Sequence, residues 1–416
     1  MIEHLELKHI GPASSMKMEF SPRLNILTGD NGLGKTFIMD IAWFVLTRTW
    51  PNLPVLPQRG KGIEPEINFL KSGQKKLSSP LKLSYSYKTQ KWLWDSYDLP
   101  PDGLVLYARA DGGVSIWDQA KNSAQRTDVD DGPDKHFSTE AIHFDAKNIF
   151  DGISQKDKVK CNGLIRDWVN WQFQKKGLFN TFSKVLEILS PNTLEIIRPG
   201  EPTRIFVDDA REIPTVNLPY GNVPVTHISA GMRRVLSLAY LMVWAWNEHL
   251  AASSLINQEP TDRFVILFDE VEAHLHPQWQ RSFMPALLEV IKILESSLKV
   301  QIIASTHAPL VLASLETEFC EDKDKILNFE LTKDSVSINE IPWVKQGDVV
   351  NWLVSESFGL QQARSRDAEL AIEAAEAFMR DDIEALPESL DTKDIIHKEL
   401  LRVLIAAAVE KQGRTG

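Results

Sequence analysis

The sequence has 416 residues, of which 43% are hydrophobic and 25% charged, as in an ordinary globular protein long enough for more than one domain. This composition excludes a disordered or collagen-like chain. The longest apolar run, at 235–246, is too short to span a bilayer, and the start MIEHLELKH has no apolar signal segment. The two cysteines, Cys161 and Cys320, support neither a disulfide framework nor a zinc site. We therefore expect a cytoplasmic protein without membrane contact, and the net charge of −11 argues against a protein that coats nucleic acid.

The first fifty residues alternate between short apolar runs and turns. Alternating apolar residues predict two strands, at 2–10 and 16–20, and a third apolar run at 23–29 predicts a buried strand that ends in glycine. Residues 37–49 are apolar on most faces and lack glycine and proline. This segment therefore predicts a buried helix.

A glycine-rich loop joins the buried strand to this helix. The residues GDNGLGKT at 29–36 match the pattern G-x-x-x-x-G-K-T of a phosphate-binding loop, in the required position between a strand and a helix. Glycines allow main-chain N–H groups to face phosphates, and the helix start adds a favourable partial charge. Lys35 is expected to reach the β- and γ-phosphates of ATP, and Thr36 to bind Mg²⁺. The other residues expected to contact the nucleotide are Gly29, Asn31, Gly32 and Gly34.

The middle of the chain consists of short elements and turns. Runs between 81 and 117 predict an antiparallel meander, and the polar residues 119–137 predict an exposed loop. Helical spacing of apolar residues follows from 161 to 190. Basic and aromatic residues are interleaved in 158–176, a pattern compatible with a contact to nucleic acid. The favoured interpretation is a helix whose aromatic residues face the core and whose basic residues face solvent.

A second chemical signal is the segment RFVILFDEVEAHLHP at 263–277. Five apolar residues end in Asp269 and Glu270, as in a buried central strand that delivers carboxylates to a site at its end. Asp269 is expected to bind Mg²⁺ through water, and Glu270 to polarise the water that attacks ATP. A solvent-facing acidic strand end is the alternative, and the phosphate-binding loop argues against it.

Two further segments carry polar residues next to apolar elements. The strand pattern QIIAS at 301–305 is followed by His307, which is either a loop residue or a hydrogen-bond partner of the γ-phosphate. Ser229 and Gly231 begin a long apolar helix in the segment ISAGMRR. Serine is a good helix cap, but a hydroxyl and a glycine N–H at a helix start also suit a nucleotide phosphate, and the spacing alone leaves both open.

The order of these motifs resembles that of the ABC-type ATPases of the SMC/RecF/OLD group. The resemblance implies an α/β fold: a P-loop ABC-type ATPase head with an inserted α+β lobe and a C-terminal helical tail. It also implies that ISAGMRR is the signature segment, so that Ser229 and Gly231 contact the ATP bound by a second copy of the chain. In this family Asp269 belongs to the Walker B motif, Glu270 is the catalytic glutamate and His307 the switch histidine.

Other residues admit two interpretations each. His274 and His276 suggest a metal centre, but contacts in the D-loop of the family explain them better. Asp322 and Asp324 suggest the acidic pair of a Toprim nuclease, yet they lie in a charge run typical of a solvated loop, and little chain remains for such a domain. Nuclease activity of this chain alone is therefore not expected. Two residues, Gln155 and Gln58, are candidates for the glutamine loop of the family, and an exposed loop glutamine is the alternative interpretation of either.

The last seventy residues differ in character from the rest. They predict amphipathic helices with acidic, alanine-rich faces, and the run GLQQARSRDAELAIEAAEAFM is similar to the tail of the Septu-type antiphage ATPases. That family works beside an HNH nuclease, which implies a partner nuclease here. The sequence thus divides into four predicted parts: 1–50 (ATPase core, first part), 51–200 (inserted β-meander and helical lobe), 201–344 (ATPase core with signature, Walker B and switch histidine) and 345–416 (helical tail).

Together these features predict an ATP- and Mg²⁺-dependent ATPase that forms a dimer or higher assembly through nucleotide and regulates a nuclease in antiphage defence. Two alternatives remain. One is a RecF-like DNA-repair ATPase, which a positive groove across the heads would favour. The other is a nucleotide sensor with slow turnover, which the sequence SAGM in place of the transporters' SGGQ keeps open.

Overall fold

The computed structural model describes residues 1–60, 63–72, 80–94, 103–123, 140–174, 177–192, 195–333, 335–347 and 349–355. The chain separates into two compact units, Met1–Gly347 and Asp348–Gly416. In the second unit the described part holds one short helix, α10 (Val349–Leu353). The rest of the helical tail predicted from 345 onward lies outside the described residues.

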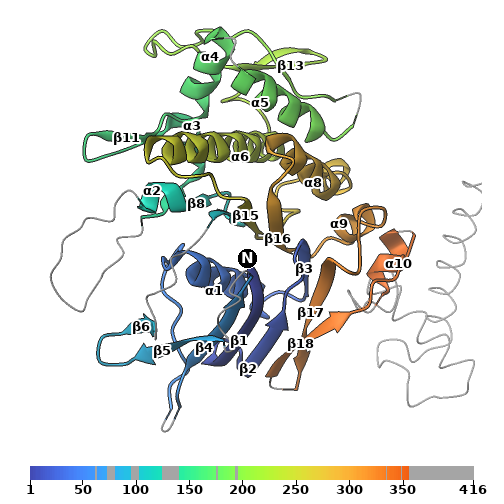
Figure 1. Ribbon diagram of the computed structural model, residues 1–416. Helices are drawn as coiled ribbons and strands as arrows, with labels where there is room; N and C mark the ends of the chain where they lie inside the picture. The colour runs from blue at the N-terminus through green and yellow to red at the C-terminus, as the bar shows by residue number, and fades with distance from the viewer. Residues whose placement is uncertain are drawn as a thin grey trace, which may run out of the picture. The chain divides into compact units, whose positions relative to one another are not determined.

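An eight-stranded sheet forms the centre of the first unit (Figure 1). The five neighbouring strands from β17 to β7 run parallel, and β18, β8 and β9 add antiparallel partners at the two edges. Because parallel strands end at the same edge, the residues that follow β3, β15, β16 and β7 meet there. In spatial order the strands are β18 (Ser335–Ile341), β17 (Asp324–Thr332), β3 (Leu24–Gly29), β16 (Lys299–Ser305), β15 (Arg263–Phe268), β7 (Leu104–Ala108), β8 (Val114–Asp118) and β9 (Ile142–Phe144).

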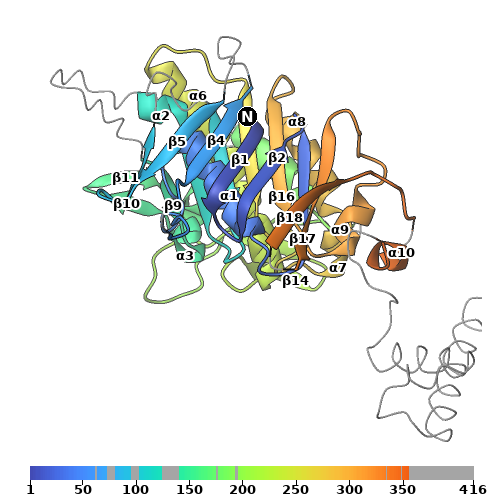
Figure 2. The same cartoon turned by 90° about the horizontal axis from the view of Figure 1, so that it is seen from below.

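A second, antiparallel sheet lies on the other side of helix α1 (Lys35–Thr47), as Figure 2 shows from below. Its strands are, in spatial order, β2 (Ala13–Glu19), β1 (Ile2–Ile10), β4 (Glu66–Lys71), β5 (Leu81–Ser86) and β6 (Lys91–Trp94). Side chains of both sheets and of α1 share one apolar core. The predicted helix is apolar on most faces because both sheets cover it. It ends at Arg48, whose left-handed φ of 62° stops the helix.

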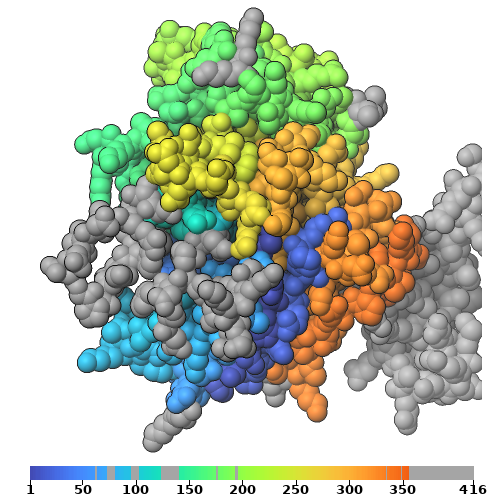
Figure 3. Space-filling model, in the orientation of Figure 1, coloured from blue at the N-terminus to red at the C-terminus, as the bar shows by residue number. Residues whose placement is uncertain are grey.

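Helices cover the opposite face of the central sheet. The long helix α6 (Ala230–Leu255) and α8 (Phe283–Leu294) lie there, and a further layer packs on them (Figures 1 and 3). This layer contains α3 (Ala146–Asp151), β10 (Ile153–Gln155), β11 (Lys158–Cys161), α4 (Leu164–Gln174), α5 (Gly177–Ile188), β12 (Arg198–Pro199), β13 (Thr215–Leu218) and β14 (Gly221–Pro224). The short helices α2 (Gln119–Ser123), α7 (Pro277–Gln280) and α9 (Pro309–Ser314) complete the unit. No helix in the described part of the chain is long and apolar enough to cross a membrane.

Two sequence-based expectations about the middle of the chain need correction. The runs between 81 and 117 do not form one meander, because β5 and β6 belong to the antiparallel sheet whereas β7 and β8 belong to the central sheet. The expected loop at 119–137 begins with the helix α2, and 124–139 lies outside the described residues. By contrast, Trp168 and Trp171 are buried against Phe182, as the core-helix interpretation predicted. Phe173, which that interpretation also placed on the core face, is 63% exposed.

The charge run before β17 is also not a solvated loop throughout. Asp324 is 2% exposed, and its carboxylate accepts hydrogen bonds from the Arg23 guanidinium and from the main-chain N–H of Cys320. Arg23 precedes β3, which is the parallel neighbour of β17. The aspartate therefore fastens the start of β17 to the start of β3, a structural role far from the strand ends that carry the phosphate-binding loop.

Candidate nucleotide-binding site

The phosphate-binding loop predicted at 29–36 connects the end of β3 to the start of α1. Its glycines have left-handed main-chain angles, with φ of 118° at Gly29, 80° at Gly32 and 100° at Gly34. A Cβ atom at Gly29 would overlap a carbonyl oxygen of β17, so only glycine fits there. Asn31 and Gly32 are exposed, and a Cβ atom at Gly32 would meet no other atom within 4 Å. The main chain at this point is therefore open to an approaching phosphate.

Lys35 is buried and lies within the curve of this loop. Its Nζ donates hydrogen bonds to the carbonyl oxygens of Gly29 at 2.8 Å and Asp30 at 2.7 Å. Burial lowers the pKa of the Lys35 ammonium group, and the nearby carboxylates, first among them Asp269, oppose that change. The cation is thus held at the position from which the motif predicts contact with the β- and γ-phosphates.

Thr36 and Asp269, the two predicted Mg²⁺ ligands, are in direct contact although they come from different elements. The Thr36 hydroxyl donates to Oδ2 of Asp269 at 2.8 Å. The hydroxyl of Ser305, at the end of β16, donates to the other carboxylate oxygen at 2.7 Å. Hydroxyl and carboxylate oxygens are the hard ligands that Mg²⁺ prefers, and Mg²⁺ takes only one or two of them from a protein. The donor set therefore fits this ion.

Glu270 has an unusual main-chain conformation. Its φ is 50°, in the left-handed region that few residues other than glycine adopt. The main-chain N–H of Glu270 donates to the Ser305 hydroxyl at 2.8 Å, so the same side chain orients both Asp269 and Glu270. Among the described residues no hydrogen bond reaches the Glu270 carboxylate. Glu270 is partly exposed.

His307 follows β16 and is fixed by Glu272. The Glu272 carboxylate accepts the main-chain N–H of His307 at 2.5 Å and the Thr306 hydroxyl at 2.7 Å. Burial lowers the pKa of the His307 imidazole, and the positive charge of Lys35 lowers it further, while the charge of Glu272 opposes both. The imidazole is therefore biased toward its neutral form and lies in the same electrostatic environment as Lys35.

The signature segment lies at the start of α6. Ser229 caps this helix, since its hydroxyl accepts the main-chain N–H of Met232 at 3.3 Å. Gly231 is buried, and a Cβ atom there would lie 2.6 Å from the carbonyl oxygen of His274. Within the described residues no hydrogen bond joins Ser229 to the phosphate-binding loop of its own chain. The capping role is thus observed, and the contact with a second chain's nucleotide stays a prediction.

The remaining sequence candidates have structural contacts of their own. His276 caps α7, because its Nδ1 accepts the main-chain N–H of Gln278 at 3.4 Å, and His274 is exposed with φ of 63°. In the described part of the chain no group of three or more His, Cys, Asp and Glu residues gathers that is able to hold a metal ion. Gln58 donates to carbonyl oxygens in the β1–β2 turn, and Gln155 is exposed on β10. The position of the glutamine loop stays unassigned.

A partly buried carboxyl, Asp40, lies one turn of α1 beyond Thr36. Burial, and to a smaller extent the charge of Asp269, raises the pKa of Asp40 to about 6, and the Arg109 guanidinium partly offsets this. Arg109 itself is anchored by a hydrogen bond to the Ser115 hydroxyl at 2.8 Å. The carboxyl group of Asp40 therefore interacts electrostatically with Asp269 at the predicted Mg²⁺ site.

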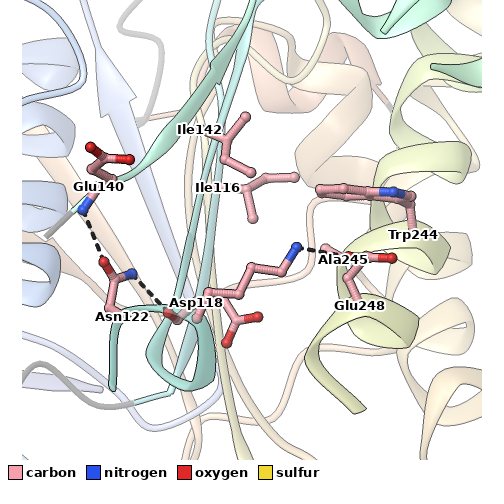
Figure 4. Close-up of a pocket in the computed structure, with 9 residues that line it drawn as sticks. Ile116, Asp118, Asn122, Glu140, Ile142, Trp244, Ala245 and Glu248 are labelled. Carbon is pink, nitrogen blue, oxygen red and sulfur yellow. Dashed lines mark hydrogen bonds and ion pairs between the residues drawn. The ribbon is translucent and has the colours of Figure 1, made fainter. Parts of the chain in front are cut away.

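A small pocket between β8, α2 and α6 lies apart from these residues (Figure 4). Its polar contacts are internal: the Lys121 ammonium group pairs with the Glu248 carboxylate at 2.8 Å and lies 4.8 Å from the centre of the Trp244 ring. These contacts fasten α2 to α6. The pocket contains none of the residues predicted to bind nucleotide.

Three residues of this site escaped the sequence analysis: Ser305, Glu272 and Arg234. Ser305 lies in the segment STH and Glu272 in the segment DEVEAHLHP. In these segments the sequence analysis assigned site roles to the neighbouring residues His307, Asp269 and Glu270 instead. Arg234 donates to the main-chain carbonyl oxygens of Asp269 and Glu270. A bond to the main chain requires no particular partner residue, so the sequence offered no signal for it.

Comparison with known proteins identifies the family of the chain. A family model described as AAA domain, putative AbiEii toxin, Type IV TA system matches residues 24–313, more than half of the chain. The match begins at β3 and ends within α9, so it includes every element that contributes to the site.

Individual relatives are more distant. The Septu protein PtuA of Bacillus thuringiensis is 22% identical over 389 residues, which cover 88% of this chain and 86% of the relative. The Retron Ec83 probable ATPase of Escherichia coli is 26% identical over 103 residues, 25% of this chain and 16% of the relative. Among solved structures, an Smc head bound to the C-winged helix domain of ScpA is 17% identical and covers 82% of this chain and 98% of its own, with a TM-score of 0.43.

Proposed function

The chain belongs to the AAA domain family described as putative AbiEii toxin, Type IV TA system, and we propose that it is an ATP-hydrolysing switch that acts in antiphage defence. The observation that carries the proposal is the convergence of Lys35, the Thr36–Asp269 pair and the unbonded Glu270 carboxylate at one edge of the central sheet. A positive charge for phosphates, hard oxygens for Mg²⁺ and a base for water are the requirements of nucleoside-triphosphate hydrolysis.

ATP binds with its phosphates on the loop 29–36. The loop N–H groups and the Lys35 ammonium group neutralise the β- and γ-phosphate oxygens, and charge-assisted hydrogen bonds of this kind are the stronger ones in proteins. Thr36 and Asp269 would hold Mg²⁺, which would supply charge neutralisation for the phosphate oxygens. The Ser305 hydroxyl keeps the Asp269 carboxylate in the orientation that this role requires.

Hydrolysis depends on Glu270. Its carboxylate accepts a proton from a water molecule whose oxygen attacks the γ-phosphorus, and the bond from that phosphorus to the bridging oxygen of ADP breaks. The products are ADP and inorganic phosphate. The neutral imidazole of His307 offers one N–H to the γ-phosphate oxygens, and Glu272 fixes its main chain through the bond to the His307 N–H.

A second copy of the chain completes the site. Ser229 and Gly231 begin α6, a helix of 26 residues whose N-terminus carries a partial positive charge, and they contact the γ-phosphate held by the other copy. Two such contacts form in a head-to-tail dimer, so ATP favours the closed assembly and its hydrolysis releases it. The helical tail predicted from the sequence and the similarity to the Septu protein PtuA support an output through a partner nuclease of the HNH type.

Phosphate release by the purified chain tests this proposal. Wild type is expected to hydrolyse ATP only with Mg²⁺, and Glu270→Gln to retain less than about 1% of the rate while it still binds ATP, as expected for loss of a general base worth 10²–10⁴-fold. Glu289→Gln is the matched control, because Glu289 is exposed on α8 and outside the site. A wild-type chain without ATP hydrolysis, or equal rates for Glu270→Gln and the control, would contradict the assignment. DNA cleavage by the chain alone would contradict the need for a partner nuclease.

A further inference from the structure

Arg234, the fifth residue of α6, joins the signature helix to the end of the catalytic strand. Its guanidinium donates to the carbonyl oxygens of Asp269 at 3.2 Å and Glu270 at 3.1 Å. It also donates to the carbonyl oxygen of Ala110, after β7, at 3.4 Å, and packs 5.5 Å from the ring centre of Phe268. One side chain thus connects three elements: α6, the end of β15 and the loop after β7.

The chemistry of these contacts favours arginine over other cations. Three carbonyl oxygens from two separate loops need several N–H donors in a fixed planar arrangement, which a guanidinium provides and an ammonium group does not. The side chain is partly buried, and the carboxylates of Asp269, Glu272 and Glu270 surround its charge. A cation that only neutralised these carboxylates would not need to donate hydrogen bonds to main-chain carbonyl oxygens, as Arg234 does.

The contact matters most at Glu270, whose left-handed φ of 50° is strained for a residue with a side chain. The Ser305 hydroxyl accepts the N–H of Glu270, and Arg234 donates to its carbonyl oxygen. The residue is therefore fixed on both sides by side chains from different elements. Such a conformation persists only where the surroundings enforce it. Main-chain bonds share in this: the Glu270 carbonyl oxygen also accepts the N–H of Ala273 at 3.0 Å, and the N–H of Val271 donates to the carbonyl oxygen of Ser305 at 3.0 Å. Arg234 is the contact that ties this turn to α6.

A second contact joins the same two regions. Gly231 packs against the carbonyl oxygen of His274 so closely that no Cβ atom fits between them. The start of α6 therefore touches the segment 269–275 at two points, through Gly231 and through Arg234, three residues apart on one face of the helix. Of these two contacts, the one through Arg234 reaches the main chain of Glu270 itself.

We propose that Arg234 is a positioning residue, which sets the main chain of Glu270 and links this carboxylate to the helix that carries Ser229. The inference rests on the proposed function and adds its regulation: occupancy of the signature segment by the nucleotide of a second copy places the carboxylate of the first copy for attack. Arg234 does not touch nucleotide in this account, so its loss affects the rate and not the binding of ATP.

The first test compares Arg234→Lys with wild type in kcat and in the Kd for a fluorescent ATP analogue. We expect kcat to fall about 10- to 100-fold, as for a displacement of a reacting group by about 1 Å, while the Kd changes less than about twofold. Arg204→Lys is the matched control, because Arg204 also donates to three carbonyl oxygens, those of residues 206, 207 and 209, on an exposed loop. A weakened Kd together with the lower kcat, or an unchanged kcat, would overturn the inference.

The second test asks whether Arg234 acts through Glu270. In the Glu270→Gln background, single-turnover rates at high protein concentration should fall less than about twofold on addition of Arg234→Lys, because interactions that work as a unit are not additive. A further drop as large as in wild type would show that Arg234 acts independently, and would refute the positioning role. The two failures are distinguishable: loss of the proposed function appears as an inactive wild type, whereas failure of this inference leaves an active wild type that is sensitive to Glu270→Gln.

Discussion

Replacement of Gly231 by alanine tests the close approach between the signature helix and the segment after β15. The added Cβ atom would lie 2.6 Å from the carbonyl oxygen of His274, about 0.8 Å short of the 3.4 Å at which ordinary contact begins. The obstacle is main chain, which cannot rotate away, so the helix start or the segment 269–275 must shift by a comparable distance. Overpacking of this kind costs about 1–3 kcal/mol of stability.

The same shift separates the signature from the catalytic strand. Misplacement of reacting groups by about 1 Å reduces rates by about 100-fold, so we expect Gly231→Ala to lower kcat between 10- and 100-fold. The Kd for ATP at the chain's own loop should stay within about twofold of wild type, because no phosphate-loop residue moves. Phosphate-release kinetics and fluorescent-nucleotide titration measure the two quantities.

The matched control is Gly177→Ala at the start of α5, where a Cβ atom meets nothing within 4 Å. It should leave kcat unchanged and the free energy of unfolding within about 0.5 kcal/mol of wild type. If Gly231→Ala behaves like this control in both respects, then the contact with His274 is not maintained in the working protein, and the argument that couples the two regions is wrong.

Three further changes probe the site. Lys35→Ala should weaken ATP binding about 10- to 100-fold in an equilibrium titration, from the loss of a charged hydrogen bond worth about 1.5–3 kcal/mol; unaltered binding would contradict the phosphate contact. Ser305→Ala removes the hydroxyl that bonds both the Asp269 carboxylate and the Glu270 N–H, and should lower the free energy of unfolding by about 1–3 kcal/mol in denaturant titration. An unchanged free energy of unfolding would contradict these two hydrogen bonds. Asp40→Asn should stabilise the nucleotide-free chain by up to about 3 kcal/mol at pH 7.5, because the folded-state pKa of about 6 exceeds the unfolded value of 3.8 and the penalty of ionisation is complete above pH 6. The advantage should shrink as the pH falls from 6 toward 4, and a constant advantage would show that ionisation of Asp40 is not its cause.

The phosphate-binding loop and the acidic strand end were predictable because their information is local. In both segments a short apolar run ends in the residues that carry the chemistry, and parallel strands bring such ends to one edge of a sheet. This is why Lys35, Thr36 and Asp269 meet although more than two hundred residues separate the first two from the third. The helix at 37–49 was predictable for the same reason.

Long-range pairing explains what the sequence did not reveal. The run LVLYA at 104–108 is equally compatible with a meander and with a buried parallel strand, and only its partner β15 decides between them. Asp324 is buried because Arg23, 301 residues earlier, is its partner. Arg234 was missed because main-chain carbonyl groups leave no trace in the sequence. The four-part division of the chain stays a prediction, although β7 to β9 already show that its second part contributes to the central sheet.

The most direct test of the central claim is the mass in solution of wild type and Glu270→Gln, each with and without Mg·ATP. The account predicts that Glu270→Gln, which binds ATP but hydrolyses it at less than about 1% of the wild-type rate, doubles its mass or more only in the presence of Mg·ATP. Wild type should show this assembly transiently, and addition of Ser229→Arg to Glu270→Gln should abolish it. If the mass of Glu270→Gln is the same with and without Mg·ATP, the nucleotide-bridged assembly and the role of Ser229 within it are contradicted.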